Sequence, residues 1–180
     1  MTGITLKGFI LAPHMERLKA ALSDEEFARV EQELGVTHRA LKLSFFKDYP
    51  VELQNALEAK LAELVYKRRH EEVAYHIGHL NFETFSQSAI GRTTLALIGK
   101  DPKKMVKATI RLLSTVMSGM EVVVNDRQGE AFSVRFRNNP HPVQGWRGVI
   151  SGALEYAGVT PRVTVVEHGR RDTEYMIAWQ

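Results

Sequence analysis

Apolar residues recur every three or four positions through most of the first two thirds of the chain, which is the spacing of amphipathic helices. The leucine stripe after Pro50 is the clearest case. Ser23 and Glu26 have the spacing of a capping box, and Gly35 can end the helix that they start. The segment 41–46 could be a strand or a buried loop. The pattern predicts helices at about Pro13–Leu22, 23–35, 50–65, 70–98 and 101–119.

After Met120 the hydrophobic period changes to about 2, which is typical of strands. Apolar and polar residues alternate over 120–125 and 132–137, and turn residues at 126–129 predict a hairpin between them. A helix at about Val143–Ala157 and two further strands, opening at Val163 and Tyr175, follow. The fold class is therefore α+β, with N-terminal helices followed by a four-stranded antiparallel sheet in strand-strand-helix-strand-strand order.

Three glycines, Gly145, Gly148 and Gly152, share one face of the predicted helix at 143–157. Each glycine costs a helix about 1 kcal/mol relative to alanine, so three on one face require a reason. The stripe indicates either close backbone packing on the sheet or the approach of a ligand or a partner chain.

Length and composition favour one globular domain. With 180 residues, 44% hydrophobic and 25% charged, we expect a single domain over 1–180, with a mainly helical part at 1–118 and a β-β-α-β-β part at 119–180. The chain has no cysteine, which excludes thiolate chemistry and suits a reducing compartment. No apolar run approaches the ~20 residues of a membrane span. We expect a soluble, cytoplasmic protein.

Several short motifs match a known family over nearly the whole chain: Leu6-Lys7-Gly8, Tyr49-Pro50, Ile77-Gly78, Ala89-Ile90-Gly91-Arg92 and the glycines from Gly145 to Gly158. On these the chain resembles a family of uncharacterised bacterial proteins that was catalogued as myxobacterial paralogues. It is also distantly similar to the 4-vinyl reductase domain and the haem-dependent nitric oxide binding domain. The resemblance implies a fold that holds small hydrophobic or planar ligands, or partner proteins, between its helices and its sheet.

The sequence departs from both distant relatives at their cofactor motifs. The nitric oxide binding domains carry a Tyr-x-Ser-x-Arg motif for the haem propionates, and this pattern does not occur here. The 4-vinyl reductase domains usually carry cysteines near the C-terminus, and this chain has none. The resemblance therefore implies the fold and a pocket, and we expect no cofactor.

The sharpest polar cluster is formed by Glu72, His76, His79 and Glu83, which fall on one stripe of the helix predicted at 70–98. Imidazole and carboxylate groups can bind zinc, iron or manganese, and His76 or His79 could be an axial haem ligand. The simpler interpretation is a solvated face on which Glu72 pairs with His76 and His79 with Glu83. We adopt it and predict no metal site, because no second ligand-bearing helix is visible.

Motifs of the common enzyme classes are missing. The sequence has no Gly-x-Ser-x-Gly elbow, and Ser151 falls on a predicted helix. Neither of the common glycine-rich phosphate loops occurs, and no pair of carboxylates is singled out by its spacing. We predict no catalytic residue and no enzymatic activity.

Two groups of basic residues could contact phosphates or an acidic partner. Phe132 and Phe136 alternate with the strand arginines, so the aromatic stacking that single-stranded nucleic acid requires is not provided. We therefore expect solvated faces and no nucleic acid partner, although the net charge is +3. The first group lies on the helix after Asp101, and the second on a strand: Lys100, Lys103, Lys104, Lys107 and Arg111, then Arg135 and Arg137.

Aromatic residues on the helices are the candidate ligand-binding residues. Tyr75, Phe82 and Phe85, with Trp146 on the glycine-striped helix and His79 as a polar group, would line a cavity if the fold analogy holds. They could equally be core residues. The predicted function is a non-catalytic sensor or adaptor that binds a small apolar ligand or a partner protein. The alternatives are an oligomerisation or scaffold module, such as a homodimer, and a metal- or haem-binding sensor.

Overall fold

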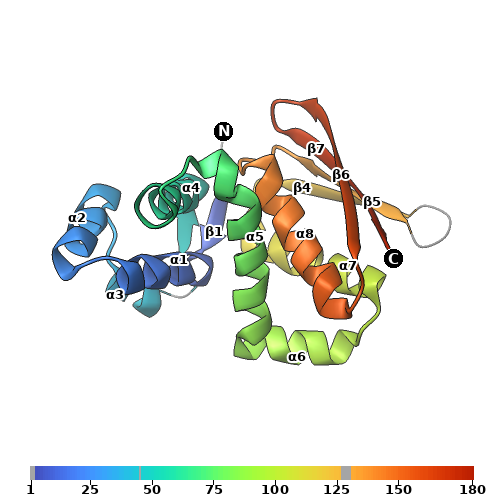
Figure 1. The fold of residues 1–180 in the computed structure, drawn as a ribbon, viewed down its shortest axis with the longest axis horizontal. Coiled ribbons are helices and arrows are strands. Elements are labelled where there is room, and N and C mark those ends of the chain that lie inside the picture. The colour runs from blue at the N-terminus through green and yellow to red at the C-terminus, as the bar shows by residue number, and fades with distance from the viewer. Residues whose placement is uncertain (1–2, 45, 127–130) are drawn as a thin grey trace. The chain divides into compact units, whose positions relative to one another are not determined.

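The computed structural model describes residues 3–44, 46–126 and 131–180. Phe45 and most of the turn predicted at 126–129 lie outside the described residues. The chain divides into two compact units, Met1–Val73 with Val116–Gly119 and Ala74–Thr115 with Met120–Gln180. Helices and antiparallel sheets confirm the predicted α+β class (Figure 1).

The first unit is built around a small antiparallel sheet with the order β2-β1-β3. Buried leucines on the helices, among them Leu11, Leu18, Leu41 and Leu57, form its core. The sequence did not indicate this sheet, because strands of two or three residues are too short to show a period of two. The elements are β1 (Thr5–Lys7), α1 (Gly8–Ala21), α2 (Asp24–Leu34), α3 (His38–Leu43), β2 (Asp48–Pro50), α4 (Val51–Lys60), the π-helix η1 (Leu61–Tyr66) and β3 (Met117–Ser118).

Two local predictions for this unit were wrong. α1 begins at Gly8 and contains Pro13 in its interior, because Leu11 lies on the same buried face as Met15 and extends the packed stripe upstream of the proline. The segment 41–46, for which the sequence allowed a strand or a buried loop, begins within the helix α3, which ends at Leu43 and whose first turn is capped by a hydrogen bond from the Ala40 amide to Thr37 Oγ1.

The second unit packs helices against a four-stranded antiparallel sheet with the order β4-β5-β7-β6. Figure 1 shows α8 lying across this sheet. The sheet face toward α8 carries buried side chains such as Phe136 and Tyr175, and the phenol of Tyr175 donates a hydrogen bond to the carbonyl oxygen of Val143. The elements are α5 (His70–Gln87), α6 (Ala89–Ile98), α7 (Pro102–Val116), β4 (Glu121–Asp126), β5 (Phe132–Arg137), α8 (Val143–Ala157), β6 (Pro161–Gly169) and β7 (Asp172–Trp179). Of α5 only the part from Ala74 onward belongs to this unit, and of α7 only the part up to Thr115.

The long helix predicted at 70–98 is interrupted at Ser88. Its hydroxyl donates to the carbonyl oxygen of Phe85 and accepts from the amide of Gly91, so it ends α5 and caps α6. A Cβ at Gly91 would overlap the same Phe85 carbonyl oxygen, which means that only glycine allows so tight a corner. The direction of α6 is therefore fixed by the end of α5.

None of the helices in the described ranges combines the length and the hydropathy needed to cross a bilayer.

Candidate functional site

The backbones of α5 and α8 are in direct contact. A Cβ at Gly78 would overlap the carbonyl oxygen of Gly145, and a Cβ at Gly148 would overlap that of Tyr75. The glycine stripe on α8 thus serves close packing, but its packing partner is α5, whereas the sequence analysis expected the sheet. The glycines do not leave room for a ligand at this crossing.

Four of the five predicted ligand-binding residues lie on α5. Phe82 is buried, its ring centroid lies 6.2 Å from that of Phe85, and a Cβ at Gly152 of α8 would lie 3.2 Å from its ring. Tyr75 and His79 lie further toward the start of α5 and are partly exposed, with ring centroids 6.5 Å apart. Phe82 thus packs against α8, and the ring centroid of Tyr75 lies 5.8 Å from the guanidinium carbon of Arg147 on that helix. Their role in ligand binding stays a prediction.

The fifth residue, Trp146, lies on a different side of α8. Its ring stacks on Phe136 of the sheet at 4.4 Å, and its Nε1 donates to Oδ1 of the buried Asn139 at 3.0 Å. A buried indole with a satisfied N–H is typical of a core residue. The structure therefore does not bring Trp146 together with the aromatic residues of α5.

Glu72, His79 and Glu83 of the polar stripe on α5 each have a partner outside the predicted pairs. His79 Nε2 lies 2.8 Å from Glu155 Oε2 on α8, while Glu83 accepts a hydrogen bond from Gln87. Glu72 pairs with Arg69. His76 is exposed. Across the residues that the structure describes, no three histidine, aspartate or glutamate side chains converge as a metal site would require.

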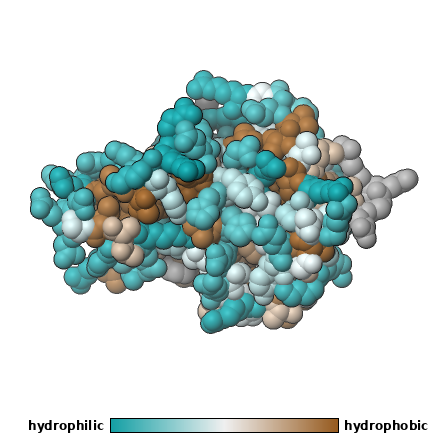
Figure 2. Space-filling view, in the orientation of Figure 1, coloured by the Kyte–Doolittle hydropathy of each residue, from teal (hydrophilic) through white to brown (hydrophobic). Residues whose placement is uncertain are grey.

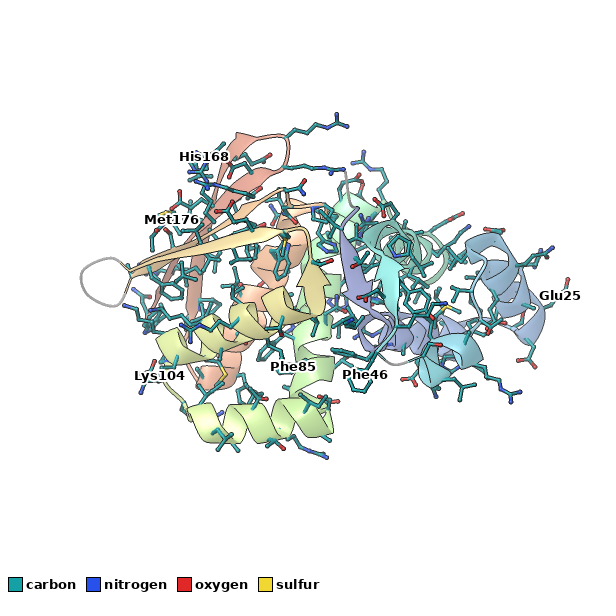
Figure 3. All side chains as sticks on the ribbon, turned by 180° about the vertical axis from the view of Figure 1, so that it is seen from behind. Glu25, Phe46, Phe85, Lys104, His168 and Met176 are labelled. Carbon is teal, nitrogen blue, oxygen red and sulfur yellow. The ribbon has the colours of Figure 1, made fainter. Side chains whose placement is uncertain are left out.

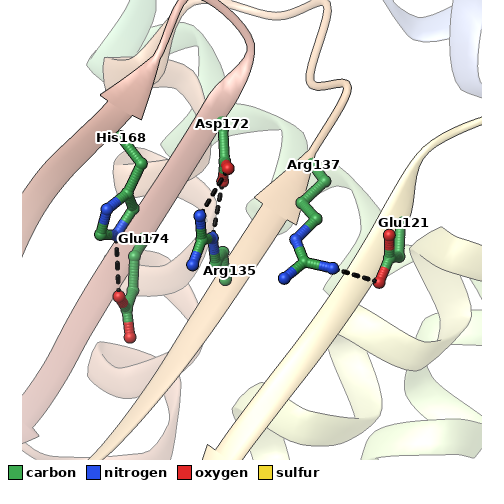
Figure 4. Close-up of polar contacts among 6 residues, drawn as sticks. All are labelled: Glu121, Arg135, Arg137, His168, Asp172 and Glu174. Carbon is green, nitrogen blue, oxygen red and sulfur yellow. Dashed lines mark hydrogen bonds and ion pairs between the residues drawn. The ribbon is translucent and has the colours of Figure 1, made fainter.

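The face of the sheet turned away from α8 carries cross-strand ion pairs (Figure 4). Arg135 makes a two-pronged contact with Asp172, with distances of 2.7 and 2.6 Å, and Arg137 contacts Glu121 at 3.0 Å. The Arg135 hydrogen bonds lower the pKa of Asp172, and Asp172 raises the pKa of Arg135. The two arginines that formed a candidate anion site are thus already neutralised by strand neighbours.

Helix α6 exposes an apolar surface, which we call the α6 face and define as Ala89, Ile90, Thr93, Ala96 and Leu97. Ile90 is 46% exposed and Leu97 is 85% exposed. The hydroxyl of Thr93 is bonded to the carbonyl of Ala89, so the threonine adds little polarity. The opposite side of α6 is anchored by Gly91 and the buried Leu95.

Basic residues lie along the chain near the α6 face. Arg92 is exposed on α6. The ammonium of Lys100 donates a hydrogen bond to the carbonyl oxygen of Tyr156 on α8 and lies 3.9 Å from the centroid of the Tyr156 ring. Figure 3 shows Lys104 at the start of α7, where its Nζ lies 3.9 Å from Asp101 Oδ2. From Ser88 to Lys107 the chain carries four lysines and one arginine, and its one acidic residue is Asp101. The sequence indicated Lys100 and Lys104 as part of a basic group, but Arg92 was not included in that group, and the apolar surface was not predicted because α6 was merged into one long helix.

A buried polar cluster in the first unit was also missed. Glu58 accepts a hydrogen bond from Gln54 at 2.9 Å, and its carboxylate oxygens lie 3.2 Å from His70 Nε2 and 3.7 Å from His14 Nε2. Mutually bonded polar groups of this kind hold helices in register. The cluster therefore joins α1, α4 and the start of α5.

Comparison with solved structures defines the class of fold. An Fe(II) unliganded H-NOX protein from K. algicida matches with a TM-score of 0.69, 11% identity and 97% coverage of both chains. A mutant H-NOX from T. Tengcongensis matches with a TM-score of 0.73, 14% identity, and 97% of this chain and 98% of the other covered. A structure described as probing heme distortion in the H-NOX family matches with a TM-score of 0.71 and 15% identity, and the match covers 97% of this chain and 95% of the other. The chain has the H-NOX fold.

The family model described as "Protein of unknown function (DUF2378)" matches residues 6–180, and the chain belongs to this family. No curated protein is similar enough to count as a match. The resemblance inferred from the sequence, an uncharacterised family distantly similar to the haem-dependent nitric oxide binding fold, is confirmed.

Proposed function

We propose that this chain is a non-catalytic adaptor of the sensor type, which acts by contact with a partner protein through the α6 face. The observation that carries the proposal is the exposure of Ile90 and Leu97 on a helix whose other side is also apolar. A helix that is apolar on both sides is normally buried, and contiguous apolar surface on a soluble fold marks an interaction site.

The charges around the face indicate the chemistry of the partner. Arg92 is exposed on α6, and Lys100 and Lys104 follow in the next segment, so the surroundings of the face are basic and the complementary surface is an apolar stripe with acidic residues at its edges. A second copy of this chain fits less well, because a twofold contact places the same patch against itself and brings cation to cation. The charges therefore favour a different protein over a homodimer.

The closed contact between α5 and α8 supports an adaptor more than a ligand cavity at this place. Phe82 packs against Gly152 of α8, and Trp146 lies on a different side of α8 from the four residues of α5. A pocket for a small apolar ligand requires several hundred Å³. The crossing of α5 and α8 therefore favours contact with a partner protein over binding of a small apolar ligand.

Haem does not fit the candidate ligands on α5. The H-NOX structures above are described with Fe(II) and with heme. In this chain His79 Nε2 is engaged by Glu155 at 2.8 Å, and His76 is exposed, so neither histidine presents a nitrogen inside an apolar cavity of its unit. We therefore derive no function that passes through haem.

Site-specific photocrosslinking tests the proposal. A photoreactive residue at position 97, introduced into the full chain in its native host, should capture one partner protein, and the same residue at the exposed Arg162 of β6 should not. Leu97→Glu should weaken the captured complex by about 10- to 100-fold, because one apolar anchor is worth roughly 1.5–3 kcal/mol. Leu97→Lys should weaken the complex less than Leu97→Glu does, because a cation at position 97 is attracted by acidic residues of the partner.

Three outcomes contradict the adaptor. Equal capture from positions 97 and 162 means that the face has no special role. Capture of a second copy of the chain alone supports the scaffold alternative. Turnover of a compound that depends on His79 or Glu155 would refute the non-catalytic part of the proposal.

A further inference from the structure

The first unit contains an open groove of about 890 Å³, formed by the end of α2, the link 35–37, and the start of α4. Half-buried apolar side chains, among them Leu34, Val36 and Leu53, line it together with Tyr49. Figure 2 shows hydrophobic surface between α2 and α4. Its volume lies in the range of small-molecule sites, roughly 300–1,000 Å³.

The walls of the groove are held in place from both sides. Glu33 near the end of α2 forms an ion pair of 2.7 Å with Lys60 of α4, and this hydrogen bond raises the pKa of Lys60. Glu31 Oε1 accepts a hydrogen bond from the amide of His38, which fixes the turn between α2 and α3. The groove is therefore formed before any ligand arrives, and binding requires little ordering of the chain.

The charged side chains that line the groove have different partners. Glu33 is neutralised by its ion pair with Lys60, and Glu31 is held toward the turn by the hydrogen bond from the His38 amide. Lys47 lines the groove with its ammonium 5.3 Å from the ring centroid of Tyr49, so a cation lies beside an aromatic ring and the apolar floor. This combination attracts an anion that is attached to an apolar or aromatic body.

We propose that the groove between α2 and α4 binds a small amphipathic carboxylate, with its apolar body on Leu34, Val36 and Leu53 and its carboxylate at Lys47. The inference goes beyond the adaptor function and does not depend on it, because the groove and the α6 face belong to different units.

Titration of the full chain with 4-phenylbutyrate and with its neutral amide tests the charge. The carboxylate should bind about fivefold more tightly than the amide, which is the upper range for a solvent-accessible ion pair. Lys47→Gln should remove this preference, whereas Lys19→Gln, an exposed lysine that does not line the groove, should keep it. Equal binding of acid and amide to the unmodified chain would overturn the assignment.

Filling the groove tests the location. Ala28→Phe places a ring in the groove and should weaken both probes at least tenfold, while Ala59→Phe, on an exposed α4 position outside the groove, should not. Unchanged binding in Ala28→Phe, or no binding of either probe at millimolar concentration, would refute the site. Neither result bears on photocrosslinking from Leu97, so the two proposals fail separately.

Discussion

Replacing Gly148 by alanine should destabilise the protein, although alanine is the better helix former. A Cβ at this position would overlap the carbonyl oxygen of Tyr75 and lie 2.8 Å from the amide nitrogen of His79, and both are backbone atoms. Backbone atoms cannot rotate away as a side chain can. α5 and α8 must therefore move apart until the methyl group reaches an ordinary contact of at least 3.4 Å.

The magnitude follows from two opposing effects. Overpacking a closed contact costs about 1–3 kcal/mol, and a clash with rigid backbone belongs at the upper end. Alanine returns about 1 kcal/mol of helix propensity. The net loss is about 2 kcal/mol, which for a chain of this length lowers Tm by about 4–8 °C.

Gly145→Ala is the matched control, because it lies on the same stripe one turn earlier. The nearest atom to its new Cβ outside the helix is the carbonyl oxygen of Ala74, at 3.8 Å, which is an ordinary contact. This variant should gain up to about 1 kcal/mol and unfold at a slightly higher temperature. Thermal unfolding followed by circular dichroism compares the two variants directly. A Gly148→Ala protein as stable as the Gly145→Ala protein would refute the direct backbone contact between α5 and α8.

Three further predictions concern the sheet and the corner between α5 and α6. Since Arg135 lowers the pKa of Asp172, their ion pair stabilises the fold above the ordinary carboxyl pKa of about 3.9, and this stabilisation is lost as the pH falls through the lowered value. The difference in unfolding free energy between wild type and Asp172→Asn should therefore be constant near neutrality and vanish in acid, and an equally large difference at about pH 2 would contradict this. Burial raises the pKa of the Tyr175 phenol, so the wild type should lose stability above about pH 10, where the unfolded phenol ionises, and Tyr175→Phe should lose less over the same range. At neutral pH, urea unfolding should show that this variant is about 1 kcal/mol less stable, because the bond to the Val143 carbonyl is missing. Ser88→Ala removes the cap of α6 and should cost about 1 kcal/mol in the same assay, and an unchanged midpoint would mean that the cap contributes nothing.

The fold class could be predicted from the sequence because each signal is local. The capping box of Ser23 and Glu26 and the left-handed Gly35 at the end of α2 are where the pattern predicts them. The alternation at 120–137 matches the observed pairing of β4 and β5. Residues a few positions apart determine such features, so one sequence is sufficient to recognise them.

The site could be predicted only in part, because its geometry depends on contacts between distant residues. His79 was expected to pair with Glu83, four residues away, but the fold brings Glu155 to it from α8. The break at Ser88 could have been noticed, since Ser88 is a good helix cap with Gly91 three positions later. Its consequence, the exposure of Leu97 on a separate helix, depends on how α6 packs, which periodicity does not report.

The tight contact and the exposed face are connected through α5. Gly78 and Gly148 fix α5 against α8, and the corner at Ser88 and Gly91 fixes α6 to the end of α5. A substitution that forces α5 away from α8 should therefore displace the α6 face without altering any residue on it. Crosslinking of the partner from position 97 should fall in Gly148→Ala and persist in Gly145→Ala.

The stability of the same variants makes this prediction decisive. If Gly148→Ala lowers Tm as calculated but leaves crosslinking from Leu97 at the wild-type level, the partner recognises α6 as an isolated helix, and the α5–α8 contact serves stability alone. If both fall together, the direction of α6 is part of what the partner recognises, because the apolar residues of the face are identical in the two proteins. A movement of α5 relative to α8 would then be sufficient to change the binding of the partner.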